Sequence, residues 1–389
     1  MEGGLLQDLT SAQVLSVPSQ QYARAAVTAD WALLSLYVAV LVIALATYNV
    51  KRSPNRASNV ALVIPSVANE SVRESLFTSL SHNRFLGVPI YVVIDEGAPL
   101  ENELKKIEWI NLVVVPKSFR PDLVGKGRAL RYFVENYVSK RPNLWYVFLD
   151  DDNLVQDDAF LYEIPYYEKR GYVAFNPVLT PRRGRSFLAY VLDHARLLDD
   201  LSFFRLFTGV LKRPLVGLHG ELLGVRGDFL LKVDAFNESS KVEDYVLASK
   251  IVRYGGRTWQ SRTRVSILSP NSLRDLVRQR SRWHSGILES LARVPSSMRV
   301  ATLIKSFSRT AGLLILWVLV PLTSSLLVLI VGIATGLVYW GVYAYAIGKN
   351  KKIIYILTIP AFWIIEAAGF FYGLLKVRSR EFIVIDKRI

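Results

Sequence analysis

Three consecutive aspartates, Asp150, Asp151 and Asp152, follow the apolar run 147–149. Like charges at this spacing repel one another, and the end of a strand is an unfavourable place to gather them. A solvated acidic turn is one explanation, and a bound cation that offsets the repulsion is the other. A further carboxylate, Asp95, closes a second apolar run at 89–95. Two runs that both end in carboxylates favour a cation-dependent phosphate site.

The composition restricts the donor atoms that such a cation could have. The 389 residues include no cysteine, which excludes disulfides, thiolate nucleophiles and cysteine-based zinc sites. The four histidines, at positions 82, 194, 219 and 284, form no H-E-x-x-H pair. Any metal site is therefore mostly carboxylate, which favours Mg²⁺ or Mn²⁺.

Two glycine-containing stretches could bring the backbone close to a ligand. The stretch "VGKGRALRYF" at 124–133 places a Gly-Lys-Gly turn before a basic helix, where backbone N–H groups and Lys126 can approach phosphate. The stretch "GLHGELLGVRGDFLLKV" at 217–233 contains glycines that permit a close backbone approach. Both have ordinary alternatives, because the first is a weak motif and the second also suits a turn-rich hairpin.

Two further stretches carry charge in patterns that suit catalysis. In "KVEDYVLASKIVRYGG" at 241–256, Glu243 and Asp244 precede a helix, although acidic residues are common at helix N-termini. In "RQRSRWHSG" at 278–286, three arginines lie beside Trp283. This cluster suits either a membrane surface or a diphosphate clamp with an aromatic floor for a sugar. The order of all these motifs along the chain is more specific than any one of them.

The elements that must position these residues are those of an α/β domain. Short β-branched runs at 59–65, 89–95, 111–116 and 145–150 predict buried parallel strands. Amphipathic stretches at 70–82 and 126–140 predict helices between them. This alternation indicates a doubly wound sheet, in which ligands bind at the carboxyl ends of the strands. The acidic residues fall at those ends.

The flanking segments are apolar enough to predict a membrane protein. The chain is 51% hydrophobic, and two of its apolar runs, 31–48 and 311–348, carry no charge. The first predicts one span and the second one or two, and the apolar run 353–375, whose only charged residue is Glu366, predicts one more. The basic residues after position 50 place the following domain in the cytoplasm and residues 1–30 outside. Residues 285–310 predict an amphipathic helix at the membrane interface or on the domain surface, and 376–389 form a basic tail.

The formal net charge of +15 has competing explanations. Nucleic-acid binding is one, but no recognisable RNA- or DNA-binding motif is present, so we expect no nucleic-acid partner. Basic residues on the cytoplasmic side of the spans and a site for a phosphorylated substrate are the others. The total of three or four spans, the side of the C-terminus and the presence of an oligomer stay open.

In these motifs the chain resembles the membrane-embedded family-2 glycosyltransferases, which are related to cellulose, chitin and hyaluronan synthases. It is most similar to Egghead-type β-mannosyltransferases and their prokaryotic relatives, through "VVVPKSF", "GKGRALRYF", "HGELLGVR", "SPNSLRDLVRQRSRW" and "EFIVIDK". The resemblance covers about 59–285 well and the predicted spans loosely. It implies a cytoplasmic α/β domain of the GT-A fold at 57–284, Rossmann-like with a mostly parallel sheet, together with transmembrane helices.

The resemblance also implies roles for individual residues. Asp244 matches the general base of a Thr-Glu-Asp motif and Glu243 its neighbour, although Val242 replaces the threonine. Asp150 and Asp152 match the Asp-x-Asp that holds nucleotide and metal, with Asp152 the direct ligand and Asp151 facing away. Implied substrate contacts come from Asp95, Lys126, Arg128, Asp150, His219, Gly220, Gln279, Arg280, Arg282 and Trp283. Glu221 departs from the serine that is common after His-Gly.

The expected activity is inverting, metal-dependent transfer from a UDP- or GDP-sugar at the cytoplasmic face of the cell membrane. A lipid or lipid-linked acceptor would give a β-linked glycolipid. The alternative is a processive synthase, like those of cellulose or hyaluronan, that extends a growing glycan and exports a β-linked polymer. A non-enzymatic lipid- or polyanion-binding protein is a third class, but it leaves the ordered carboxylates without a role.

Overall fold

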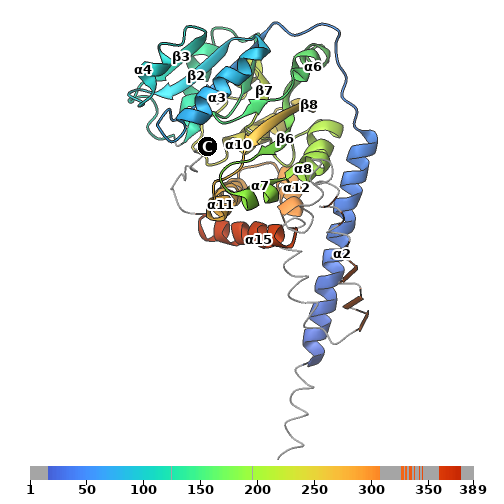
Figure 1. The fold of residues 1–389 in the computed structure, drawn as a ribbon. Coiled ribbons are helices and arrows are strands. Elements are labelled where there is room, and N and C mark those ends of the chain that lie inside the picture. Colours follow the sequence, from blue (N-terminus) through green and yellow to red (C-terminus); the bar gives the residue numbers. More distant parts are fainter. Residues whose placement is uncertain are drawn as a thin grey trace, which may run out of the picture.

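An eight-stranded sheet forms the centre of the protein in a computed structural model (Figure 1). The structure describes residues 16–306 except 124 and 195, isolated positions between 326 and 344, and residues 359–377. The strand order is β3-β2-β1-β4-β7-β6-β8-β5. The four predicted strands are present and mutually parallel as β1 (Val60–Pro65), β2 (Ile90–Asp95), β3 (Ile110–Val115) and β4 (Trp145–Phe148).

The other half of the sheet is mixed and was not predicted from the sequence. Strand β7 (Leu223–Arg226) lies antiparallel to both β4 and β6 (Tyr172–Arg182). The long strand β8 (Arg257–Leu268) runs parallel to β6, and the short β5 (Leu154–Val155) closes the edge in the antiparallel direction. The 217–233 stretch therefore supplies β7 and the following helix α9 (Gly227–Lys232) instead of a hairpin.

Both faces of the sheet are buried, as expected for a doubly wound fold. Along β1, Leu62 and Ile64 belong to one apolar cluster, and the alternate residues Ala61 and Val63 belong to another. The first cluster packs under α3 (Arg73–Asn83) and α6 (Ala159–Glu168), and α4 (Glu101–Leu104) follows β2. The second packs under α5 (Lys126–Phe133), its π-helical continuation η2 (Val134–Val138), α9 and α10 (Glu243–Arg253).

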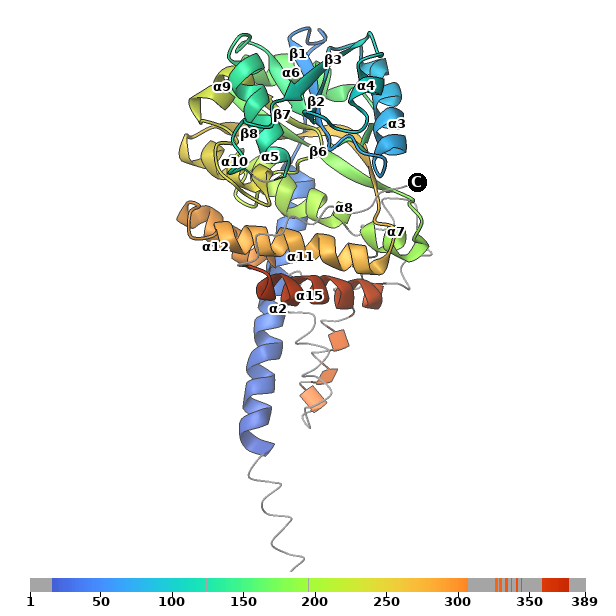
Figure 2. The ribbon, with the colours of Figure 1, turned by 90° about the vertical axis from the view of Figure 1, so that its left-hand side faces the viewer.

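A layer of helices lies below the sheet (Figure 2). It contains α7 (Phe187–Asp193), α8 (Arg196–Asp199), η3 (Asp200–Val210), α11 (Leu273–Ser290), α12 (Ser296–Ser306) and α15 (Ile359–Leu375). Helices α11 and α15 run side by side in both views. The single amphipathic helix expected over 285–310 is divided between α11 and α12. Pro295 separates them, since proline lacks the N–H that an uninterrupted helix requires.

The predicted membrane segments are only partly described. Residues 31–47 of the run 31–48 lie within the long helix α2 (Ser16–Thr47), which projects from the sheet-containing body (Figure 1). Residues 311–348 lie almost entirely outside the described residues, and of 353–375 the structure describes α15. Among the helices it describes, none combines the length and apolar character needed to cross a membrane. The number and position of membrane spans stay predictions.

Candidate active site

A cavity of about 490 Å³ opens at the carboxyl ends of the strands, between the sheet and α11. Its wall includes residues that follow β1, β2 and β4, the start of α5, the 216–221 loop, the start of α10 and one face of α11. Most of the sequence-predicted site residues lie on this wall: Asp95, Lys126, Asp150, His219, Gly220, Glu243, Asp244, Gln279, Arg282 and Trp283.

Lys126 links the two acidic motifs. It is the first residue of α5, after Gly125, whose φ of 61° favours glycine. Its Nζ lies 2.8 Å from Asp150 Oδ1 and 2.9 Å from Glu243 Oε1. Burial alone would lower the pKa of Lys126, but Asp150 and Asp244 outweigh it and the pKa is raised. The ammonium group therefore stays charged at neutral pH.

Asp244 is a partly buried carboxylate on the same wall. Its Oδ1 accepts a hydrogen bond of 2.7 Å from the backbone N–H of Tyr245, which orients the carboxyl group. Burial raises its pKa, Lys126 opposes that effect, and Glu221 adds to it. A carboxyl group with a raised pKa is suited to accept a proton.

Gly220 leaves room between the lysine and the aspartate. A Cβ added at Gly220 would lie 2.8 Å from Lys126 Nζ and 3.4 Å from Asp244 Oδ2. Any side chain at this position would therefore occupy the space beside the proposed base. Steric contact with Lys126 and Asp244 thus explains why position 220 is a glycine.

The three aspartates face different directions. Asp150 contacts Lys126, and Asp151 also lines the cavity and accepts a hydrogen bond of 2.6 Å from Ser66 Oγ. Asp152 is fully buried behind the wall, where its backbone oxygen accepts a 2.8 Å hydrogen bond from Arg182. The expectation that Asp152 faces the ligand and Asp151 faces away is therefore reversed in the structure.

Cation binding would depend on few protein donors. Within the described parts of the chain, no three aspartate, glutamate or histidine side chains converge as a metal site. Asp150 and Asp151 nonetheless present the hard oxygen donors that Mg²⁺ and Mn²⁺ prefer. Such ions often bind through one or two carboxylates, with substrate phosphates and water completing the shell. These residues fit a cation that arrives with a diphosphate.

Asp95 belongs to an ion pair whose other member, Arg128, lies outside the cavity lining. Asp95 lies on the wall, and Arg128 pairs with its carboxylate from behind. Arg128 Nε also donates to the carbonyl of Phe119 at 2.7 Å, and another of its nitrogens donates to the carbonyl of Pro116. Arg128 therefore supports the loop after β3, and it is not among the residues that line the cavity.

Helix α11 presents only part of its basic motif to the cavity. Gln279, Arg282 and Trp283 follow the i, i+3, i+4 pattern of one helical face and line the wall. Arg280 is turned about 100° from Gln279. It is fully buried, and its Nη2 and Nε each lie 2.7 Å from a carboxylate, Asp193 Oδ1 and Glu366 Oε1. The structure thus does not place Arg280 at the diphosphate, contrary to expectation.

The inner end of the cavity holds charged pairs that sequence reasoning missed. Arg196 lies 3.4 Å from Glu221, and Lys305 lies 3.6 Å from Asp199. His219 contacts Asp200 at 2.6 Å and packs against the ring of Phe204. Burial lowers the pKa of Lys305 to about 8. His219 and Glu221 belong to the His-Gly-Glu sequence noted above. No local motif marked Arg196, Asp199, Asp200 and Lys305, because η3 and the ends of α8 and α12 come together only in the fold.

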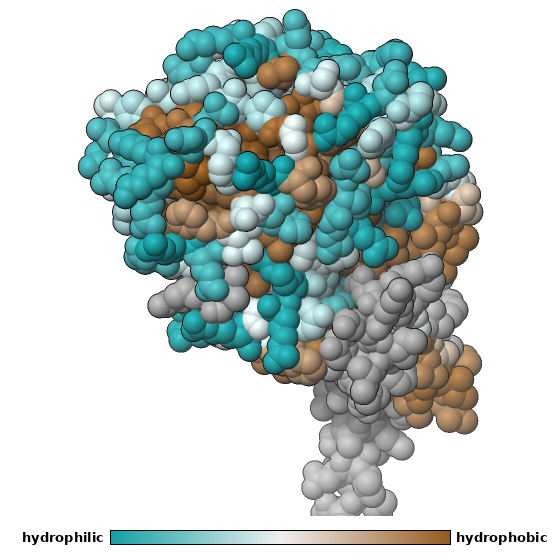
Figure 3. All heavy atoms as spheres, turned by 45° about the horizontal axis from the view of Figure 1, so that its top comes forward, coloured by the Kyte–Doolittle hydropathy of each residue, from teal (hydrophilic) through white to brown (hydrophobic). Residues whose placement is uncertain are grey.

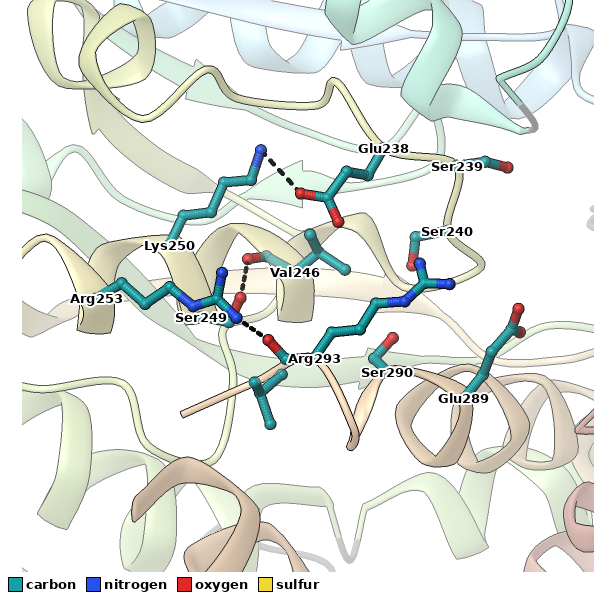
Figure 4. Close-up of a pocket in the computed structure, with 11 residues that line it drawn as sticks. Glu238, Ser239, Ser240, Val246, Ser249, Lys250, Arg253, Glu289, Ser290 and Arg293 are labelled. Carbon is teal, nitrogen blue, oxygen red and sulfur yellow. Dashed lines mark hydrogen bonds and ion pairs between the residues drawn. The ribbon is translucent and has the colours of Figure 1, made fainter. Parts of the chain in front are cut away.

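A separate small depression lies on the other side of α10 (Figure 4). It measures about 40 Å³ and contains the pair Lys250–Glu238 at 3.3 Å, and Arg253 donates to the carbonyl of Arg293. It shares no residue with the larger cavity. The cavity at the carboxyl ends of the strands is therefore the candidate active site, because it contains the predicted acidic and basic site residues.

Comparison with known proteins identifies the family. The family described as Glycosyl transferase family group 2 matches residues 145–372. The chain is 27% identical over 219 residues to beta-1,4-mannosyltransferase bre-3 of Caenorhabditis briggsae, covering 54% of this chain and 47% of that protein. It is 23% identical over 335 residues to beta-1,4-mannosyltransferase egh of Drosophila melanogaster, covering 77% and 70%. The chain thus spans about half the length of the worm enzyme.

A solved structure supports the GT-A fold. The mannosyltransferase PcManGT from Pyrobaculum calidifontis, in complex with GDP-Man and Mn²⁺, has a TM-score of 0.59 and 14% identity, covering 93% of this chain and all of that one. The mixed α/β sheet is therefore of the GT-A type, and the expected resemblance to Egghead-type enzymes is confirmed. The chain belongs to glycosyl transferase family group 2.

Proposed function

We propose that this enzyme transfers mannose from GDP-mannose to a lipid or lipid-linked acceptor at the cytoplasmic face of the cell membrane, with inversion. The observation that carries the proposal is the grouping of Lys126, Asp150 and Asp244 on one cavity wall at the strand ends. The mannosyltransferases among the relatives support the sugar, and the GDP-Man in the solved structure supports the nucleotide.

Asp244 acts as the general base in this proposal. It takes the proton from an acceptor hydroxyl, and the oxygen then attacks the anomeric carbon on the face opposite the diphosphate. The bond from that carbon to the phosphate oxygen breaks, and its electron pair leaves with the nucleoside diphosphate. A single displacement inverts configuration, so an α-linked nucleotide sugar gives a β-glycoside.

Lys126 and Arg282 balance the charge of the departing diphosphate. Both line the cavity, and Lys126 stays protonated for the reasons given above. Glu243 positions the lysine through the 2.9 Å contact, and Asp150 with Asp151 would hold Mg²⁺ or Mn²⁺. When bound, such a cation would neutralise part of the diphosphate charge and lower the carboxylate repulsion.

The membrane placement is supported by the surface of α2. Val42, Ile43 and Leu45 of this helix are 57%, 46% and 36% exposed. Figure 3 shows hydrophilic residues around most of the outline of the body, hydrophobic residues across its upper left and centre, and a further hydrophobic group at the lower right, the side on which α2 lies in Figure 1. An apolar helix face exposed in this way suits a lipid environment.

The test uses the purified full-length chain in detergent or nanodiscs. GDP-mannose and a panel of UDP-sugars are supplied with Mn²⁺ or Mg²⁺, with and without total lipid extract, and nucleoside diphosphate release and product size are measured. We expect release from GDP-mannose that requires lipid and yields a small, extractable product. A high-molecular-weight product would instead establish the processive polysaccharide synthase, and release from none of the donors would refute the proposal.

The base is tested with Asp244→Asn beside Asp228→Asn, an exposed aspartate on α9 that lies outside the cavity. We expect Asp244→Asn to lower transfer by about 10²–10⁴-fold while GDP-mannose binding changes little. Asp228→Asn should behave as the unaltered enzyme. Transfer by Asp244→Asn at a near-normal rate would show that another group removes the proton.

A further inference from the structure

A second large cavity, of about 380 Å³, lies where α2 ends and the chain enters the body. It shares no residue with the active-site cavity. Its wall is contributed by the segment after α2, by β6, α8 and η3, and by the middle of β8. The lining residues are Tyr48, Val50, Val178, Leu197, Leu201, Arg205, Ser261, Arg262 and Arg264.

The wall combines three arginines with an apolar surface. Arg262 and Arg264 are two residues apart on β8, so their side chains emerge on the same side of the strand, and both residues are exposed. Arg205 joins them from η3, where its Nε donates to Gln260 Oε1 at 2.9 Å. Two valines, two leucines, Tyr48 and Ser261 form the rest of the wall. No acidic residue is among the lining residues.

Two carboxylates close to this region, those of Glu163 and Asp157, accept hydrogen bonds from neighbouring groups. Glu163 accepts hydrogen bonds of 3.1 Å from the indole of Trp259 and from the backbone N–H of Arg262. Asp157 accepts from the backbone N–H groups of Ala159 and Arg264, at 3.0 and 3.2 Å. Neither side chain lines the cavity, so the cavity presents a positive field toward an entering anion.

The position of the cavity indicates which anion it would meet. Thr47 is the last residue of α2, and the exposed Val42 and Ile43 lie about 8 Å or less away along the helix axis. The exposed basic residues Lys51 and Arg52 follow after residues 48–50. An apolar helix face that ends at a basic, partly apolar hollow matches a lipid with acyl chains beside α2 and a phosphate at the arginines.

We infer that this cavity binds the phosphate headgroup of an anionic membrane lipid and thereby fixes the depth and orientation of the catalytic domain at the membrane. The inference rests on the membrane placement proposed above, and it does not depend on the identity of the donor sugar. The three arginines favour a lipid headgroup whose only charge is the phosphate. They would repel the ammonium group of a zwitterionic headgroup.

The test is a lipid titration of the full-length protein in detergent, followed by native mass spectrometry of retained lipid. Phosphatidylglycerol and phosphatidylcholine of the same chain length are compared, and inorganic phosphate is added as a competitor. We expect saturable retention of phosphatidylglycerol at least about tenfold tighter than that of phosphatidylcholine. Equal retention of both lipids would overturn the inference. Displacement by equimolar phosphate would show a free-anion site instead.

The paired variants separate this site from general surface charge. The double variant Arg262→Gln, Arg264→Gln should bind phosphatidylglycerol about tenfold or more weakly. The double variant Arg262→Lys, Arg264→Lys keeps both charges and should lose less affinity for this lipid. Lys140→Gln with Lys169→Gln removes the same charge from exposed residues outside the cavity and should change nothing. If both glutamine pairs weaken binding equally, the cavity is not the site. Nucleoside diphosphate release, measured in parallel, reports the proposed enzymatic function separately.

Discussion

Replacing Arg280 separates its structural role from the substrate-binding role that the motif implies. Arg280 lies between Asp193 and Glu366, with N–O distances of 2.7 Å to each, and the exposed fraction of all three side chains is 2% or less. Arg280→Leu leaves two carboxylates buried without the guanidinium between them. Removing one partner of a buried ion pair typically costs about 3–5 kcal/mol. For a chain of this size, that corresponds to a fall in Tm on the order of 5 °C.

Donor binding should respond quite differently to the same substitution. An arginine that binds the diphosphate of the donor contributes a charge-assisted hydrogen bond of about 1.5–3 kcal/mol. Loss of that hydrogen bond raises the donor Kd by about 10–150-fold. Because Arg280 does not line the cavity, we expect Arg280→Leu to change the donor Kd of the folded protein by less than about threefold. Arg282→Leu, by contrast, should weaken donor binding by the larger factor, since Arg282 is on the cavity wall.

The assay combines thermal unfolding in detergent with a titration of GDP-mannose at a temperature where every variant is folded. Arg278→Leu on the same helix is the matched control, because its pair with Asp275 is 3.6 Å long and partly exposed. Such pairs contribute about 1 kcal/mol or less. A large loss of donor affinity in Arg280→Leu, with an unchanged Tm, would refute the assignment of Arg280 to the protein interior.

Three other changes test the site. Gly220→Ala should lower transfer by about tenfold or more because the new methyl group meets Lys126 and Asp244, and single-turnover rates with GDP-mannose measure this. Glu221→Gln should move the acidic limb of the kcat/KM profile to lower pH. Asp244 must be ionised to act as a base, so activity falls as the pH drops through its pKa. The charge of Glu221 helps to raise that pKa, and removing this charge should lower it. An acidic limb that stays in place would show that Glu221 does not affect the pKa of Asp244. Chelation with EDTA should abolish nucleoside diphosphate release and added Mn²⁺ or Mg²⁺ should restore it, whereas full activity in EDTA would exclude the cation.

The parallel half of the fold was predictable because its signals are local. Each of the strands β1 to β4 is a short apolar run, and the carboxylates Asp95 and Asp150 mark where two of these runs end. The mixed half gave no such signal. Strand β8, for example, contains Arg262 and Arg264 on its exposed side, so its sequence lacks the continuous apolar character of a buried strand.

Side-chain direction on α11 illustrates a second limit. The motif Gln-x-x-Arg-Trp predicts one helical face, and the structure places Gln279, Arg282 and Trp283 on the cavity as that pattern requires. Arg280 has the same chemistry as Arg282 but faces α7 and α15. Its partner Glu366 is 86 positions away along the chain, so only the tertiary fold reveals that the charge is already neutralised.

The run of three aspartates shows why adjacent carboxylates need not share one ligand. A turn after β4 sends successive side chains in different directions, so Asp150 contacts Lys126, Asp151 contacts Ser66, and Asp152 is buried behind both. Each direction has its own compensating group: an ammonium for Asp150, a hydroxyl for Asp151 and the guanidinium of Arg182 for Asp152. Burial lowers the pKa of Arg182, and the charge of Asp152 partly offsets that lowering. The repulsion that makes this sequence unusual is therefore reduced before any cation binds. What a cation adds is specific to the cavity, where Asp150 and Asp151 would meet the diphosphate, and so its removal should affect donor binding more than folding.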